Sequence, residues 1–272
     1  MFIQIHTPHP PLRAFVKSII YYRGYTAAKP YEMLLPDGNS QLVIELDGND
    51  RVLKDKQKRV DLALNRGWIT GIQTQPVIYQ SERKATTLSI QFEPGGLFAL
   101  FGIPARKFQD AMIDTASIFE CSLNELREKL LECQTAEGII KTTCHFLEGR
   151  VLPSESKQAL IHFIIGRLCT QNRPLTQIST EAGYSQKQLI QIFKDHVGVS
   201  PKRYQRILRF SQSLSILAAQ PTADYSQILS ACNYYDQAHF INEFRHFSGY
   251  RPSQYHAMTL DYPHVISLDT AR

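Results

Sequence analysis

The 272-residue sequence predicts an α+β protein, in which an N-terminal β-rich, barrel-like domain with flanking helices precedes an all-α domain. Two observations carry this prediction. Short runs of β-branched and aromatic residues dominate to about residue 93, whereas the last third has apolar residues at helical spacing and repeats itself about fifty residues apart. The length suffices for two compact domains. We place them at residues 1–152 and 153–259, followed by a C-terminal tail at residues 260–272.

The strands of the first half are predicted from runs rich in Val, Ile and aromatic residues. The clearest run is Gln41–Leu46, and Asp47-Gly48-Asn49 then predicts a turn into a second strand around Arg51–Lys54. Further strands are expected at Trp68–Ile72, Val77–Gln80 and Thr86–Phe92.

The sequence becomes helical after Glu93-Pro94-Gly95-Gly96. A turn of this kind can bind phosphate on free amides, but this one lacks the further glycines and the lysine of a P-loop, so we interpret it as an ordinary turn. Gly149–Ser156 is the expected linker between the domains. Helices before it are expected at Leu97–Phe101, Leu123–Cys133 and Ala136–Leu147.

The last third contains the same supersecondary unit twice, at Ile178–Tyr204 and Ile228–Tyr255. Each copy has an amphipathic helix, a tight turn and a second amphipathic helix, which is the pattern of a helix-turn-helix. A long helix, predicted to start at Ser200-Pro201 and to end near Ala219, joins the copies. Two such units in one chain predict a protein that reads two DNA sites.

In the first copy, Leu175–Ala182 is the supporting helix, and Gly183 supplies the backbone freedom that a tight turn needs. Ser185 can cap the following helix, which is expected at Gln186–His196. In the second copy, Asp236 is the expected cap and three phenylalanines form the buried side. Its outward side is expected to carry Gln237, His239, Asn242, Glu243 and His246.

The free faces of the two second helices carry side chains that suit base edges. Gln and Asn can pair with adenine and Lys with guanine, and a helix in the major groove presents only its first turns to the bases. An alternative is that these polar faces are merely solvated. The predicted base-reading residues are Gln186, Lys187, Ile190 and Gln191 in the first copy, and Gln237, Ala238, His239, Ile241 and Asn242 in the second.

Basic and hydroxyl side chains around these helices are candidates for phosphate contacts, which position a protein on DNA. The basic residues of the joining helix can equally form an ordinary solvated face. The predicted phosphate-contacting residues are Ser185, Lys194, Lys202, Arg203, Arg206, Arg209 and Arg245.

Two helix-turn-helix units, joined by a helix that opens with Gly198-Val-Ser-Pro-Lys-Arg-Tyr204, resemble the AraC/XylS family of transcriptional regulators over about Ser156–Met258. The resemblance implies a seven-helix DNA-binding domain, whose two recognition helices enter successive major-groove segments on one face of double-stranded DNA. It also implies a bacterial, cytoplasmic activator with RNA polymerase as a further partner.

The second unit departs from the family pattern at three positions. The small residue of the supporting helix is Ser179 in the first unit but Leu229 in the second. Asn233 stands where the turn usually has glycine, although Asn tolerates positive φ better than most residues. Arg251 replaces the usual capping Ser or Thr. We therefore interpret the second unit as the weaker or more adaptable reader.

The segments Leu34–Asn39 and Ser89–Leu97 are similar to an uncharacterised N-terminal domain that accompanies a subset of these regulators. In other members of the family, a β-barrel half binds an effector and adjoining helices form a homodimer. By analogy Leu123–Leu147 is a dimer element, although packing on its own sheet explains these helices as well. The candidate ligand-binding residues are aromatic with polar tips, and core packing explains them equally: Tyr22, Tyr31, Trp68 and Tyr79.

Enzymatic, metal-binding and membrane classes find no support in the sequence. His6, His9 and His145 are too scattered for a metal site, and we expect no catalytic residues and no cofactor. Five cysteines without a CxxC pair indicate reduced, mostly buried thiols. No apolar run approaches the roughly 20 residues of a membrane span, and the N-terminal residues lack a basic region followed by an apolar core, so we expect a cytoplasmic protein.

The positive charge lies in the predicted DNA-binding part. Residues from 153 onward contain 12 Lys or Arg and 8 Asp or Glu, whereas residues 1–152 contain 18 and 17. The sequence therefore predicts a DNA-binding regulator governed by its N-terminal domain. Two alternatives are an enzymatic or partner-binding N-terminal domain that the C-terminal domain localises to DNA, and a regulator without a ligand.

Overall fold

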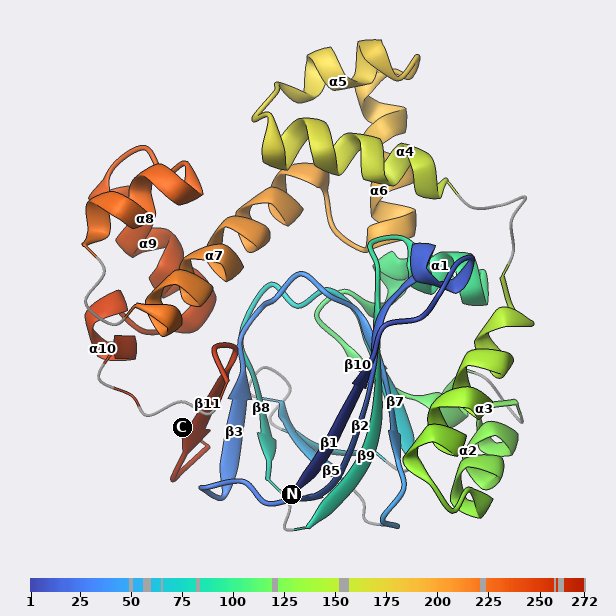
Figure 1. Cartoon of the computed structure of the whole chain (residues 1–272). Coiled ribbons are helices and arrows are strands. Elements are labelled where there is room, and N and C mark those ends of the chain that lie inside the picture. Colours follow the sequence, from blue (N-terminus) through green and yellow to red (C-terminus); the bar gives the residue numbers. More distant parts are fainter. Residues whose placement is uncertain are drawn as a thin grey trace.

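In the computed structural model of this protein, the described residues are 1–48, 51–55, 60–64, 66–81, 84–118, 122–151, 157–220, 224–256, 258 and 262–271. Figure 1 shows two β-sheets with helices along one side, and a group of helices that lies above and beside them. The predicted boundaries at residues 152/153 and 259/260 lie outside the described residues. Short 3-10 turns occur at Leu12–Ala14, Ala105–Phe108 (η2) and Thr115–Ser117.

The first sheet, sheet A, has six antiparallel strands in the order β1-β2-β9-β4-β7-β10. The strands are β1 (Phe2–His6), β2 (Val16–Tyr25), β4 (Gln41–Glu45), β7 (Gly67–Thr70), β9 (Ala85–Phe92) and β10 (Met112–Asp114). The sequence predicts β4, β7 and β9 close to their observed bounds, but it does not predict the other three.

The second sheet, sheet B, has five antiparallel strands in the order β11-β3-β8-β5-β6. The strands are β3 (Tyr31–Leu34), β5 (Arg51–Asp55), β6 (Val60–Leu64), β8 (Val77–Gln80) and β11 (Val265–Leu268). A strand, β5, follows Asp47-Gly48 as predicted, but β4 and β5 pair in different sheets, so these two strands do not form a hairpin. β4 is a buried central strand whose two neighbours are β9 and β7.

β11 comes from the segment predicted to be a C-terminal tail. It adds an edge strand to sheet B by pairing antiparallel with β3, and Ile266 lies opposite Met33. Ile266 is buried, with 2% of its surface exposed. The end of the chain therefore returns from the helical domain to the β-rich one (Figure 1).

Helices cover the face of sheet A that points away from sheet B (Figure 1). They are α1 (Gly96–Phe101), α2 (Ser122–Glu132) and α3 (Ala136–Glu148). Leu123, Leu126 and Leu130 of α2 are buried in the core that these helices form with Ile19 and Ile90 of the sheet. These leucines of the expected dimer element are thus used within the domain, which agrees with the alternative that the helices pack on their own sheet.

The C-terminal part folds into the seven helices that the family resemblance implies. They are α4 (Gln158–Ile165), which continues as a π-helical turn at Gly166–Thr170, α5 (Leu175–Glu181), α6 (Gln186–Val197), α7 (Pro201–Ala219), α8 (Tyr225–Cys232), α9 (Gln237–Ser248) and α10 (Pro252–His256). α6 and α9 are the second helices of the two helix-turn-helix units.

Local chemistry fixes the ends of these helices as the sequence predicts. The side chain of Ser185 accepts a hydrogen bond from the amide of Gln188, which completes a capping box. The Asp236 carboxylate accepts one from the amide of His239 at 2.7 Å. Gly183 and Asn233 both take positive φ, at 73° and 54°, so Asn233 does perform the turn usually made by glycine.

The helical domain shares its core with the outer face of sheet B. Met33, Ile78 and Ile266 belong to the same hydrophobic cluster as Phe210 and Phe244 of the helices. The two domains are thus packed against each other. Within the described part of the chain, no helix is both long and apolar enough to cross a membrane.

Candidate nucleic-acid interface

The recognition helix of the first unit, α6, presents a polar face at its start. Gln186, Lys187 and Gln191 are exposed, and Ile190 is half-buried. The opposite side, which includes Leu189, is fully buried in the core. The four predicted base-reading residues of this helix therefore lie together outside the core.

The last turns of α6 contact the N-terminal domain. The rings of His196 and Phe98 of α1 lie 4.2 Å apart between centroids, and Asp195 forms an ion pair with Arg106 of η2. A Cβ added at Gly198 would lie 3.2 Å from the carbonyl oxygen of Ala105, so the approach of the two backbones is close. The C-terminal end of α6 therefore packs against the N-terminal domain, whereas its N-terminal end is exposed.

One predicted base reader belongs to this contact. Nε2 of Gln191 donates to both carboxylate oxygens of Asp195, at 3.1 Å each, and Asp195 in turn pairs with Arg106. The Asp195 carboxylate therefore connects Arg106 of the N-terminal domain to Gln191 on the exposed face of α6. Sequence reasoning misses Arg106, because its partner is distant along the chain and no local pattern marks the pair.

The recognition helix of the second unit, α9, has the same arrangement. Gln237, Ala238 and Asn242 are exposed, and His239 and Ile241 are half-buried. The rings of His239 and Tyr234 lie 5.5 Å apart, which holds the imidazole beside the turn. Gln237, Ala238, His239 and Asn242 thus lie away from the core, whereas Ile241 packs against its edge.

Glu243 corrects the prediction for the outward side of α9. Its side chain is only 10% exposed and forms three hydrogen bonds with Arg206 of α7, at 2.6, 3.0 and 3.1 Å. Hydrogen bonding to Glu243 also raises the pKa of Arg206. The carboxylate points inward because a cation of the joining helix lies beneath it, and the pair links α7 to the second unit.

The remaining phosphate candidates divide into two groups. Lys194, Lys202 and Arg245 are exposed. Arg203 instead donates through Nη2 to the Thr74 hydroxyl of the N-terminal domain at 2.9 Å. The guanidinium of Arg209 lies 5.4 Å from the ring centre of Tyr234. In this conformation the side chains of Arg203, Arg206 and Arg209 serve contacts within the protein, as does the capping hydroxyl of Ser185.

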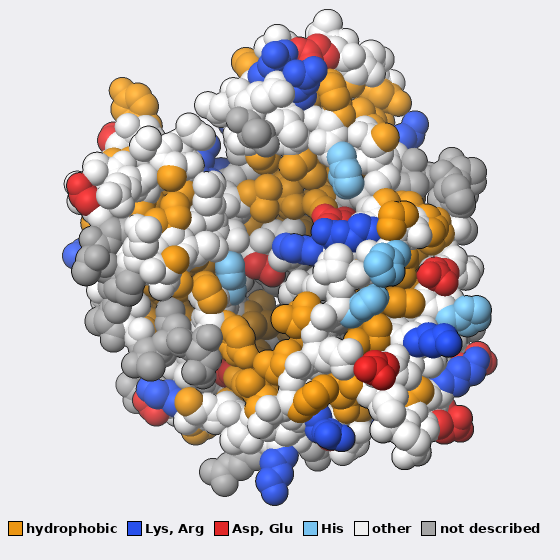
Figure 2. Space-filling model, viewed as in Figure 1, with side chains coloured by type: hydrophobic (Ala, Val, Ile, Leu, Met, Phe, Trp, Pro, Cys, Tyr) orange, Lys and Arg blue, Asp and Glu red, His pale blue; other side chains and the backbone are white. Residues whose placement is uncertain are grey.

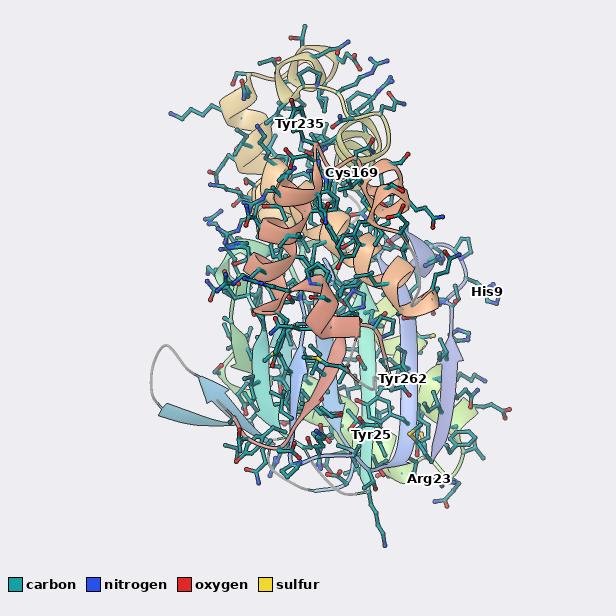
Figure 3. All side chains as sticks on the ribbon, turned by 90° about the vertical axis from the view of Figure 1, so that its left-hand side faces the viewer. His9, Arg23, Tyr25, Cys169, Tyr235 and Tyr262 are labelled. Atoms are coloured by element: carbon teal, nitrogen blue, oxygen red, sulfur yellow. The ribbon has the colours of Figure 1, made fainter. Side chains whose placement is uncertain are left out.

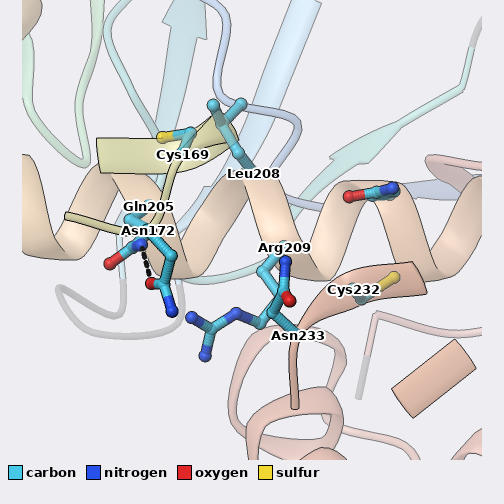
Figure 4. Close-up of a pocket in the computed structure, with 8 residues that line it drawn as sticks. Cys169, Asn172, Gln205, Leu208, Arg209, Cys232 and Asn233 are labelled. Carbon is cyan, nitrogen blue, oxygen red and sulfur yellow. Dashed lines mark hydrogen bonds between the residues drawn. The ribbon is translucent and has the colours of Figure 1, made fainter. Parts of the chain in front are cut away.

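A small cavity lies beside α7, between the two helix-turn-helix units (Figure 4). It has a volume of about 50 Å³ and is lined by polar residues that include Gln205, Arg209 and Asn233. Nε2 of Gln205 donates to the side chain of Asn172 at 3.2 Å. A volume of this size holds one or two water molecules, so the cavity is too small for an effector.

Tyr235 is an exposed residue that the sequence analysis does not single out. It is 92% exposed and immediately precedes the cap of α9. Figure 3 shows it at the end of the molecule that carries the helix-turn-helix units. One local pattern in the sequence indicates this exposure: the turn contains two adjacent tyrosines, and Tyr234 is the one that is buried.

Three of the four aromatic ligand candidates gather between the two sheets. Tyr79 and Trp68 pack against one small cluster with Leu64, and the strand register places Tyr22 on the same face of sheet A as Trp68. Tyr31 does not join them, because it lies on the outer face of sheet B and packs against the helical domain. Because side chains alternate along β3, Tyr31 and Glu32 lie on opposite faces of sheet B.

The thiols of the described residues are free. Cys232 is buried, while Cys133, Cys144 and Cys169 are half-buried, so burial is less complete than the sequence predicts. Burial raises the pKa of both Cys169 and Cys232 to about 11. Cys121 lies outside the described residues. Among those described, no group of three or more His, Cys, Asp or Glu is placed to hold a metal ion.

Two domain families match the chain. Residues 178–258 match a helix-turn-helix domain, and residues 4–114 match a domain of unknown function, DUF6597. Among curated proteins, no sequence matches.

The solved structures that match this chain are distant in sequence. ToxT from Vibrio cholerae with bound unsaturated fatty acid is 12% identical, with a TM-score of 0.48, over 89% of this chain and 96% of that one. ToxT from Vibrio cholerae O395 is 14% identical, with a TM-score of 0.48, over 89% and 99%. The AraC-like transcriptional activator CuxR is 14% identical, with a TM-score of 0.26, over 79% and 87%.

The family match at residues 178–258 spans both turn-helix pairs and coincides with the two exposed recognition faces. This chain is therefore a DNA-binding transcriptional regulator, with an AraC-type helix-turn-helix domain at its C-terminus and a DUF6597 domain at its N-terminus.

Proposed function

We propose that α6 and α9 read two adjacent major-groove segments of double-stranded DNA, and that the N-terminal domain controls this reading by holding α6. The observation that carries the proposal is the arrangement of α6, whose start is exposed and whose end contacts α1 and η2. A helix held in this way cannot turn toward DNA independently of the domain that holds it.

The base contacts are assigned to the exposed starts of the two helices. Gln186, Lys187, Ile190 and Gln191 read the first segment; Gln237, Ala238, His239, Ile241 and Asn242 read the second. Exposed Lys194, Lys202 and Arg245 contact phosphates. Arg206 is assigned a structural role because Glu243 occupies its guanidinium.

Control runs through three contacts between the domains. They are the ion pair of Asp195 with Arg106, the hydrogen bond from Arg203 to Thr74, and the ladder between β11 and β3. An effector or partner that shifts sheet B or η2 thus changes the position of α6 relative to α9. The spacing between the two contacted segments follows from that position. Cytoplasmic location, contact with RNA polymerase and a homodimer are further parts of this proposal.

Selection of binding sites from random DNA by the full chain tests the reading. The expected consensus contains two blocks whose centres are about 10 base pairs apart, one turn of the duplex. Lys187→Ala should relax the preference within one block only, and Asn242→Ala within the other, by about 1–3 kcal/mol at the affected base pair. A single block, or relaxation of the same block by both variants, would refute the assignment.

A further inference from the structure

The face of sheet A that points toward sheet B differs in polarity from the face that the helices cover. Side chains alternate along each strand, and the register places Ser18, Gln41, Ser89 and Gln91 on the face toward sheet B. They form the hydrogen bonds Ser18–Gln91 at 2.9 Å and Ser89–Gln41 at 3.3 Å. The space between the sheets is therefore polar, unlike the apolar core beneath the helices.

Glu32 of β3 lies in this space and is 2% exposed. Its two carboxylate oxygens accept hydrogen bonds from the phenols of Tyr25 and Tyr79, the latter at 2.5 Å. Among the described residues, none of the ion pairs involves Glu32. A buried carboxylate without a cation is costly, and two donors fill about half of its roughly four acceptor positions.

The phenols act as donors to an ionised carboxylate. Burial, with the charge of Glu32 as the next cause, raises the pKa of Tyr79 well above its usual value. Tyr79 therefore keeps its proton and donates it. The second phenol, of Tyr25, can donate to the other oxygen of the same carboxylate.

Aromatic side chains surround this charge. The rings of Tyr22 and Tyr25 lie 6.1 Å apart, and Tyr79 packs with Trp68 in one cluster. Nε1 of Trp68 is buried and has no hydrogen-bond partner among the described residues. A carboxylate beside aromatic faces is the arrangement that attracts an organic cation, and the indole N–H adds a donor for an acceptor on the same molecule.

The space between the sheets opens on one face of the molecule. Figure 2 shows a hollow in the middle of the face on which the edges of the two sheets meet, with hydrophobic side chains around it. Ile3 and Ile5 of edge strand β1 are 39% and 66% exposed, and their register places them on the same face as Tyr22. They give the opening an apolar rim.

We propose that the space between the sheets binds a small protonated amine, with Glu32 as its counter-ion and the neighbouring tyrosine and tryptophan rings as its walls. Its link to regulation rests on the proposed function: Glu32 lies opposite Ser267 of β11, so an occupied site adjoins the strand that returns from the DNA-binding domain. The proposed site is far from the recognition helices, since Tyr25 and Tyr235 lie toward opposite ends of the molecule (Figure 3).

Trp68 is the single tryptophan of the chain, so its fluorescence reports the site directly. The full chain is titrated with 2-phenylethylamine, 2-phenylethanol and phenylacetate, which share a ring and differ in the charge of the end group. The amine should shift the emission and bind at least about tenfold more tightly than the alcohol or the carboxylate. Equal affinities, tighter binding of the carboxylate, or no binding of the amine would overturn the proposal.

Glu32→Gln keeps the shape of the side chain and removes its charge, so the preference for the amine should disappear. Glu132→Gln makes the same change on the exposed end of α2 and should leave the titration unchanged. An amine preference that survives Glu32→Gln would overturn the proposal. The comparison of the three probes on the unaltered chain decides it even if this variant does not fold. Amine binding without any change in operator affinity would leave the site valid and count against control by the N-terminal domain.

Discussion

The ion pair between Arg206 and Glu243 ties the joining helix α7 to the second recognition helix. Three hydrogen bonds connect the two side chains, and the guanidinium also lies 5.5 Å from the ring centre of Phe247. Loss of either partner leaves a charge beside an apolar surface. The pair is therefore a structural feature of the second unit, in a region where the sequence suggests either a phosphate contact or a solvated face.

Arg206→Ala should lower the free energy of unfolding by about 1–2 kcal/mol, because Glu243 then remains without a partner and the partial exposure of Arg206 limits the loss. Lys202→Ala is the matched control on the same helix, since Lys202 is exposed. It should change stability by less than about 0.5 kcal/mol but reduce the slope of log affinity against log salt by about one. Chemical denaturation and DNA titrations at several salt concentrations distinguish the two. Equal effects of both variants on stability would contradict these roles.

At the scale of elements, the two turns of the helix-turn-helix units use different residues for one conformation. Gly183 and Asn233 both have positive φ, and a Cβ at Gly183 would touch nothing within 4 Å. Only backbone strain therefore opposes an alanine in the first turn. The three departures of the second unit from the family pattern do not alter this geometry.

Gly183→Ala should destabilise the chain by about 1–2 kcal/mol, the cost of a left-handed backbone for a residue with a Cβ. Asn233→Ala should destabilise it by less, because Asn already has a Cβ and only its greater tolerance of positive φ is lost. Asn233→Gly should be nearly neutral, because glycine adopts this φ freely but is more flexible when unfolded. Thermal or chemical unfolding measures all three. If Asn233→Ala is as stable as the parent chain, the turn does not depend on the tolerance of Asn for positive φ.

The helices of the DNA-binding domain can be predicted because their determinants are local. Ser185, Ser200 and Asp236 cap helices within three residues of themselves, and apolar spacing sets the rest. The exposure of Lys187 and Asn242 follows from the same periodicity. Glu243 does not follow, because a single pairing with Arg206 across 37 residues outweighs the pattern.

Sheet pairing depends on contacts that no local pattern marks. Asp47-Gly48 is a strong hairpin signal, yet the strands on either side of it enter different sheets. β11 and β3 are more than 200 residues apart, and Val265–Leu268 alone is too short to reveal that it pairs. The cluster around Glu32 combines residues from four strands, so the sequence indicates its aromatic members but not the carboxylate that organises them.

In the molecule as a whole, the C-terminal segment that contains β11 contacts both domains. Its residue His264 accepts a bond from the amide of Leu35 through its carbonyl oxygen, and its ring is hydrogen-bonded to Ser211 of α7 at 2.9 Å. Burial lowers the pKa of His264, while Asp37 opposes and Lys17 adds to this effect. The imidazole is therefore held neutral where β11 meets both domains.

Because the pKa of His264 is lower in the folded chain than the usual value of about 6.5, the released form binds a proton more readily. Well above pH 6.5 the His264 imidazole is neutral in the docked and the released form, so it adds no pH dependence to docking. As the pH falls below 6.5, protonation of the released form favours release of β11. Amide hydrogen exchange in β11 should accelerate between pH 7.5 and 5.5 after correction for the intrinsic rate, and less so in His264→Gln. An identical pH response in both chains would remove His264 from this account.

In the proposed function the docked N-terminal domain sets how the recognition helices meet DNA, and undocking β11 removes one of the contacts on which this depends. Ile266→Asp places a charge on a buried side chain of β11, whereas Thr270→Asp makes the same change at an exposed position of the same segment. Both are compared with the parent chain on one operator selected by the full chain, by affinity and by footprint. We predict that Ile266→Asp changes the affinity about tenfold or more, or alters the footprint of one block, while Thr270→Asp does neither. An unchanged affinity and footprint for a folded Ile266→Asp chain would contradict the claim.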